Sequence, residues 1–219
     1  MRYILLHIIW VFLLIFSVSS CQSKESQEGM EFAASIMEQN SFNPTLVKKA
    51  FCRYDSIMKS LPDTVAQNKF RIGAIKSLSD TAYDPLTISI RFITLSPKEF
   101  GYKIASDYAN SVSNGNASAK QFGQHLKLIN KTAQAIGLSA YITETNKYIQ
   151  EYIDSLPLVD QMRIYASSTT PEVLAATLRN LYNQPNADKA EINQQMDALR
   201  SVYSPSDYNI FIKNFNLKQ

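Results

Sequence analysis

Residues 86–95 read LTISIRFITL, the one stretch of this chain whose pattern favours a β-strand. Apolar side chains alternate with polar ones from Leu86 to Phe92, and a period of two is typical of a half-buried strand. The alternation fails at Ile93, however, and no second stretch of comparable strand character exists to pair with this one. Since a strand needs a partner for its backbone hydrogen bonds, we interpret Leu86–Leu95 as a helix.

The same ten residues fit a helix that is buried on most sides. Asp84 precedes Pro85; aspartate caps helices because its side chain accepts hydrogen bonds from the free N–H groups of the first turn. Proline suits the first helical position. On this helix Thr87, Arg91 and Thr94 fall on one narrow stripe, and nearly all other side chains are apolar. That distribution indicates a central helix with neighbours around most of its circumference.

Helical patterns continue along the chain on both sides of this segment. Apolar residues recur at three- and four-residue steps, the spacing of one helix face. The longest such stripe comprises Leu46, Val47, Ala50, Phe51, Tyr54, Ile57, Met58 and Leu61. Five prolines follow residues that cap helices well: Asn43-Pro44, Asp84-Pro85, Ser96-Pro97, Thr170-Pro171 and Ser204-Pro205. We therefore expect an all-α fold, a compact array of about nine short helices.

The first residues have the pattern of a signal segment. Arg2 precedes a nearly unbroken apolar run of 13 residues, Ile4–Phe16. A transmembrane helix needs about 20 apolar residues, whereas the apolar region of a signal peptide spans about 7–15. An uncleaved membrane anchor is the alternative that this run leaves open.

The residues after that run, Val18-Ser19-Ser20-Cys21, are an aliphatic residue, two small residues and a cysteine. They resemble the lipobox of bacterial lipoprotein signal peptides. The resemblance implies that residues 1–20 are removed and that Cys21 receives fatty acyl chains. It also implies anchoring in the cell envelope, for which we favour the outer membrane over the inner. Residues 21–29 would then be the lipidated cysteine and a flexible tether, because the polar residues 22–29 lack apolar periodicity. Residues 30–219 would form a single all-α domain, large enough to fold without disulfides or metals.

Composition excludes several functional classes. The chain has 22 basic and 19 acidic residues, and this near balance offers no electrostatic basis for nucleic-acid binding. Loss of the signal segment would leave His125 as the one histidine and Cys52 as the one free thiol, too few for a zinc site built on nitrogen and sulfur ligands. The glycines form neither a phosphate-binding loop nor a dinucleotide motif. We expect no metal and no cofactor.

The sharpest catalytic hypothesis is a nucleophilic pair of Cys52 and His125, since a thiolate needs a nearby base. Cys52 lies between Phe51 and Tyr54 on an apolar helix, where cysteine usually packs as a small hydrophobe. His125 lies one position off an apolar stripe. We therefore expect both residues to be structural. A hydrolase that uses carboxylates remains an alternative, although no spacing singles out a pair.

Tyr141, Tyr148 and Tyr152 are separated by seven and four residues, which places them on one helix face. Faces rich in tyrosine can form interfaces because each ring combines apolar area with a polar tip. Burial in a wide core contact is the competing interpretation. We expect a lipid-anchored, non-catalytic binding or accessory module that contacts another envelope component, with Tyr141, Tyr148 and Tyr152 as the candidate interaction face. The alternatives are an envelope hydrolase and a small-ligand or glycan carrier with a tyrosine-lined cavity.

Overall fold

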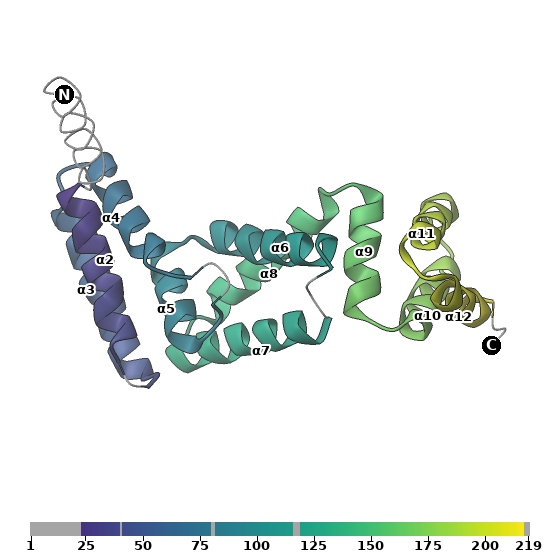
Figure 1. Cartoon of the computed structure of the whole chain (residues 1–219), viewed down its shortest axis with the longest axis horizontal. Coiled ribbons are helices and arrows are strands. Elements are labelled where there is room, and N and C mark those ends of the chain that lie inside the picture. Colours follow the sequence, from purple (N-terminus) through teal and green to yellow (C-terminus); the bar gives the residue numbers. More distant parts are fainter. Residues whose placement is uncertain (1–22, 40, 80–81, 116–118, 217–219) are drawn as a thin grey trace, which may run out of the picture. The chain divides into compact units, whose positions relative to one another are not determined.

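The computed structural model describes residues 23–39, 41–79, 82–115 and 119–216, and these form eleven α-helices and no strand (Figure 1). The helices are α2 (Lys24–Met37), α3 (Pro44–Ser60), α4 (Thr64–Lys76), α5 (Pro85–Thr94), α6 (Pro97–Ser113), α7 (Ala119–Ile136), α8 (Ser139–Asp154), α9 (Leu158–Ser168), α10 (Pro171–Tyr182), α11 (Lys189–Val202) and α12 (Pro205–Phe215). The all-α class is confirmed. The described residues hold eleven helices where about nine were expected, because short turns such as residues 155–157 separate helices that periodicity alone does not divide.

The segment with strand-like alternation is the helix α5. The Asp84 carboxylate accepts hydrogen bonds from the N–H groups of Leu86 and Thr87, each 3.0 Å long, and so caps its first turn. Every residue from Thr87 to Thr94 is buried, including the polar stripe. The expectation of a central, buried helix is confirmed.

Arg91 shows how α5 buries a charged residue. Its side chain is 1% exposed, and its guanidinium donates hydrogen bonds to the carbonyl oxygens of Ala82 (2.7 Å) and Ser79 (2.9 Å). The same group lies 4.9 Å from the centre of the Tyr83 ring. A buried charge is tolerated when hydrogen bonds replace its hydration. Arg91 therefore fastens the turn before α5 onto that helix.

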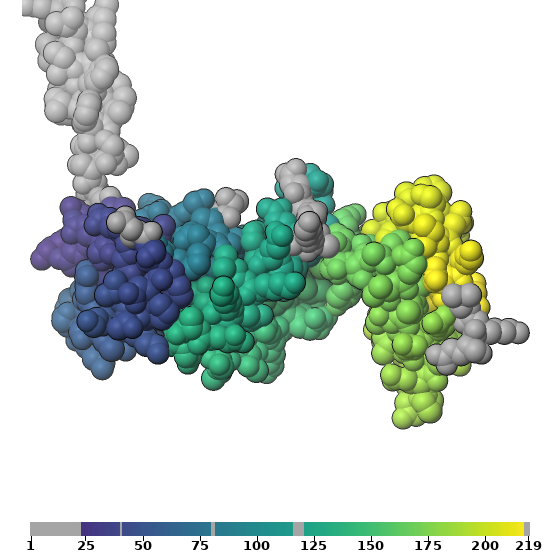
Figure 2. Space-filling view, turned by 90° about the horizontal axis from the view of Figure 1, so that it is seen from below, coloured from purple at the N-terminus to yellow at the C-terminus, as the bar shows by residue number. Residues whose placement is uncertain are grey.

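The chain divides into two compact units after Thr94, where one domain over residues 30–219 was expected. The first unit contains α2–α5 and has a core in which the rings of Phe32, Tyr54 and Phe70 lie 5.7–6.0 Å apart. The second contains α6–α12. Within it the green-to-yellow helices α10–α12 pack together (Figure 2) around a core that includes Leu178, Leu199 and Phe211.

Two glycines allow α2 and α4 to lie side by side (Figure 1). A Cβ atom at Gly29 would lie 2.0 Å from the Phe70 carbonyl oxygen, and one at Gly73 would lie 2.0 Å from the Ser26 carbonyl oxygen. Only glycine permits so close an approach of two backbones.

The contact between α2 and α4 shows that the expectation of a flexible tether over residues 21–29 is wrong for the part of it that the structure describes. Residues 24–29 belong to α2, which begins after Ser23, whose side chain accepts a hydrogen bond from the Ser26 N–H group. Gly29 is buried. The polar segment lacks apolar periodicity because α2 contacts α4 here through a glycine rather than through large apolar side chains. Cys21 and the rest of the signal segment lie outside the described residues.

Candidate functional sites

The predicted tyrosine face lies on α8, and a glycine on α6 allows α6 to pack closely against α8 there. A Cβ atom at Gly101 would lie 2.7 Å from the Thr145 carbonyl oxygen and 2.8 Å from the Tyr148 Cβ atom. The two helices therefore cross in close contact. This contact places Tyr102, the next residue on α6, beside Tyr148 and Tyr152.

These three tyrosines form one ring cluster. The Tyr102 ring centre lies 6.2 Å from that of Tyr148 and 5.5 Å from that of Tyr152, both edge-to-face. Lys98 lies one turn before Tyr102, and its Nζ atom is 5.2 Å from the Tyr102 ring centre and 5.6 Å from that of Tyr148. All three rings are partly exposed. We call Lys98, Tyr102, Tyr148, Glu151 and Tyr152 the tyrosine surface.

The tyrosine surface carries charges of both signs. The Tyr102 hydroxyl donates a 2.6 Å hydrogen bond to the Glu151 carboxylate. This bond, helped by burial and by the negative charge, raises the pKa of the Tyr102 phenol. Lys98 supplies the positive charge over the ring faces, where a cation is attracted electrostatically. The surface therefore offers flat apolar area, hydroxyl groups, an ammonium and a carboxylate within a small region.

Tyr141, on the same α8, has a different role from Tyr148 and Tyr152. Its hydroxyl donates a 2.9 Å hydrogen bond to the Leu95 carbonyl oxygen. Burial, with the nearby charges of Glu99 and Glu144, raises the pKa of Tyr141. The Tyr141 hydroxyl therefore stabilises the fold, through its hydrogen bond to Leu95, and does not belong to the exposed ring cluster. Lys98 and Tyr102 could not be assigned to this face from the sequence because they lie on another helix; their spacing of four residues was the available signal.

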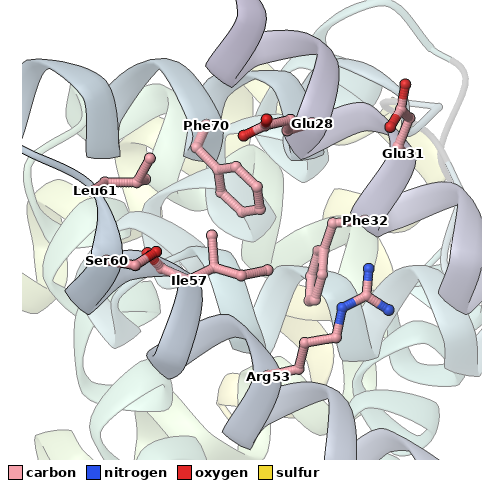
Figure 3. Close-up of a pocket in the computed structure, with 8 residues that line it drawn as sticks. All are labelled: Glu28, Glu31, Phe32, Arg53, Ile57, Ser60, Leu61 and Phe70. Carbon is pink, nitrogen blue, oxygen red and sulfur yellow. The ribbon is translucent and has the colours of Figure 1, made fainter.

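A pocket of about 310 Å³ lies in the first unit, between α2, α3 and α4 (Figure 3). Its apolar lining comes from Phe32, Ile57, Leu61 and Phe70. Its polar lining comes from Glu28, Glu31, Arg53 and Ser60. None of these residues was predicted from the sequence to belong to a binding site, because the pocket joins three helices that no local pattern relates.

Arg53 is the positive charge of this pocket. Its guanidinium carbon lies 5.1 Å from the centre of the Phe32 ring, and one of its nitrogens donates a 3.3 Å hydrogen bond to the Ser35 hydroxyl. Glu28 is the half-buried carboxylate and lies 3.6 Å from the exposed Lys24 ammonium. Glu31 is exposed and accepts a 3.1 Å hydrogen bond from Gln27.

The two residues of the candidate nucleophilic pair, Cys52 and His125, lie on different helices and in different units of the chain. Cys52 belongs to α3 in the first unit, whereas the partly exposed His125 belongs to α7 in the second. The expectation that Cys52 packs as a small hydrophobe is wrong, since its side chain is exposed. The apolar stripe of α3 passes through Val47, Tyr54 and their neighbours, and Cys52 falls on the opposite face.

The ranges that the structure describes contain no group of three or more histidine, cysteine, aspartate or glutamate side chains able to hold a metal ion. Over the same ranges, none of the helices combines the length and apolarity that crossing a membrane requires. Comparisons with protein families, with curated proteins and with solved structures found no match to this chain.

Proposed function

We propose that this protein is a lipid-anchored component of the bacterial cell envelope, with the outer membrane favoured, that acts as a non-catalytic binding or accessory module. The tyrosine surface would bind a second envelope protein. The lipobox-like Val18–Cys21 supports the location. An anchor also raises the effective concentration of a module near partners in the same membrane.

The observation that carries the binding role is the partly exposed cluster of Tyr102, Tyr148 and Tyr152. Tyrosine is enriched at protein interfaces, and residues of this kind dominate the binding energy when a partner desolvates them. Lys98 and Glu151 flank the rings with opposite charges, which favours a protein partner of mixed charge over a uniformly charged polymer.

Site-specific photocrosslinking in the native membrane tests this role. A photoreactive phenylalanine analogue replaces Tyr152 in the full chain, and the matched control carries it at Lys147, which is exposed on α8 but outside the tyrosine surface. We expect a discrete crosslinked product from position 152 and none from position 147. Identical products from both positions would contradict the proposal.

A second substitution connects the crosslink to the ring cluster. Tyr148→Ala keeps the Cβ atom that packs against Gly101, so the helix crossing should persist and the circular dichroism spectrum should not change. Loss of a central interface tyrosine typically costs a large share of the affinity. We expect the crosslink from position 152 to fall about tenfold. A Tyr148→Ala protein that crosslinks as well as wild type would remove the support for this surface.

A further inference from the structure

We propose that the pocket between α2, α3 and α4 binds a short apolar peptide with both termini free, with Arg53 holding its carboxylate and Glu28 its ammonium group. This inference is independent of the tyrosine surface, which lies on other helices. It rests on the arrangement of Glu28 and Arg53, two of the three charged lining residues, on either side of apolar side chains (Figure 3).

The apolar floor sets the kind of side chain that the pocket accepts. Phe32 and Phe70 lie at its base but are each only 1% exposed, so the half-buried Ile57 and Leu61 are the apolar side chains that a ligand can contact. Small-ligand pockets usually range from about 300 to 1,000 Å³ and combine apolar walls with a few polar groups. At about 310 Å³ this pocket is at the small end of that range, which suits a di- or tripeptide.

Arg53 is the group that would take the carboxylate. Among the residues that the structure describes, it forms no ion pair with an acidic side chain; its contacts are the Phe32 ring and the Ser35 hydroxyl. The ring and the hydroxyl hold the guanidinium in place and leave other N–H donors available. A guanidinium presents paired donors that match the two oxygens of a carboxylate.

Glu28 lies beside Phe70, across the pocket from Arg53 and Phe32 (Figure 3). Its one ion pair within the described ranges is with Lys24, at 3.6 Å and with the lysine 86% exposed. Such a surface pair is weak, so a ligand ammonium can compete for the carboxylate. The two charges stand on opposite sides of the pocket (Figure 3), so a ligand that carries its ammonium and its carboxylate at opposite ends can pair with both, and a peptide is such a ligand.

Calorimetric titration of the full chain in detergent with leucyl-leucine tests the site. We expect saturable binding that weakens about tenfold or more when either terminus is blocked, by N-acetylation or by C-terminal amidation, since each block removes a charge-assisted contact. Free leucine should bind at least tenfold more weakly than leucyl-leucine. Absence of binding, equal binding of the blocked peptides, or equal binding of leucine would each overturn the proposal.

Substitutions then assign each terminus to its residue. Arg53→Gln should weaken leucyl-leucine binding about tenfold or more and abolish the effect of amidation, while the effect of N-acetylation remains. Glu28→Gln should show the converse. Arg53→Lys should give intermediate affinity because it keeps the charge and loses the paired donors. Lys49→Gln, an exposed change on α3 outside the pocket, is the matched control and should bind as wild type. If both blocked peptides remain weaker on Arg53→Gln, the assignment of the carboxylate to Arg53 is wrong.

Discussion

Buried polar side chains in this protein form local hydrogen bonds that make their burial possible. Thr94, Thr132 and Thr145 each donate to the carbonyl oxygen four residues earlier in their own helix, at 2.7–2.9 Å. Arg91 donates to two carbonyl oxygens of the preceding turn. At the residue scale, therefore, burial follows from whether a side chain finds an acceptor and not from its polarity alone.

Two tyrosine hydroxyls differ in whether they have a hydrogen-bond partner, and this predicts that removing them has different effects on the stability of the fold. Tyr141 donates to Leu95, so Tyr141→Phe leaves a carbonyl without its donor and should lower the free energy of unfolding by about 1 kcal/mol. The buried hydroxyl of Tyr203 has no hydrogen-bond partner in the part of the chain described, and burial, with the charges of Asp207 and Glu172, raises the pKa of Tyr203 to about 12. Tyr203→Phe should therefore be neutral or stabilising.

Chemical denaturation of the two variants alongside wild type measures both effects. Both changes remove one phenolic hydroxyl group and nothing else, so each variant is the control for the other. An equal loss of stability in the two variants would show that the hydrogen bond to Leu95 is not the cause.

Asp84 predicts a specific dependence of stability on pH. Burial acts to raise the pKa of Asp84, but hydrogen bonds from Thr87 and from the N–H groups of Thr87 and Leu86 outweigh it and lower the pKa. A lowered native pKa means that the charged form stabilises the fold above the unfolded value, about 3.9. That contribution is lost as the pH falls through the lower native value.

Asp84→Ala should therefore lower the free energy of unfolding by about 1 kcal/mol at pH 7, the usual value of a helix cap. Asp84→Asn keeps a capping oxygen but does not titrate. Denaturation curves from pH 7 to pH 3 should show wild type losing its advantage over Asp84→Asn progressively below about pH 5. An advantage that already declines between pH 7 and pH 5 would contradict the assignment to Asp84.

At the scale of helices, capping patterns identified helix starts that the structure bears out. All five helices expected to begin at a capped proline do so, at Pro44, Pro85, Pro97, Pro171 and Pro205. Ser96 and Glu99 form the full capping box. Thr170 is the exception, since its side chain makes no capping hydrogen bond although α10 begins after it. Such starts are predictable because a cap acts within one helical turn.

The crossing of α2 and α4 predicts a large difference between two glycine substitutions. Gly73→Ala would place a Cβ atom 2.0 Å from the carbonyl oxygen of Ser26. This oxygen belongs to the backbone and cannot move aside as the end of a flexible side chain could. We expect a loss of about 3 kcal/mol in the free energy of unfolding. Gly123→Ala on α7 meets nothing within 4 Å and should be stabilising by about 0.5–1 kcal/mol, because alanine favours the helix.

Urea denaturation, followed by circular dichroism, compares the two variants. Both add one methyl group to a helical glycine, so propensity favours both and only the contact differs. A Gly73→Ala protein as stable as wild type would show that α2 and α4 do not approach so closely.

At the scale of the whole molecule, the central prediction concerns the anchor at Cys21. Because the residues around it resemble a lipobox, we expect the wild-type chain to incorporate a tagged fatty acid and to sediment with membranes. Cys21→Ala should do neither. Cys52→Ala is the matched control, since it removes the exposed thiol of α3, and it should label as wild type. Labelling of Cys21→Ala at the wild-type level would disprove lipidation at this position.

The sequence by itself determined the features that depend on a few neighbouring residues. Helical class, helix starts at capped prolines and the buried α5 all follow from spacings within one or two turns. It also selected Tyr141, Tyr148 and Tyr152 as one face, because residues on one face of a helix can be recognised from their spacing.

Only the tertiary structure decided which helices meet. It extended α2 back to Lys24 through the Gly29 contact, placed Tyr102 beside Tyr148 and Tyr152, and joined Glu28 and Arg53 around one pocket. It also divided the chain into two units after Thr94. Each of these depends on backbones or side chains far apart in the chain coming into contact, and a glycine that permits close approach carries no periodic pattern in one sequence. Local rules therefore predict the helices of this protein, while its surfaces and pocket arise from packing between them.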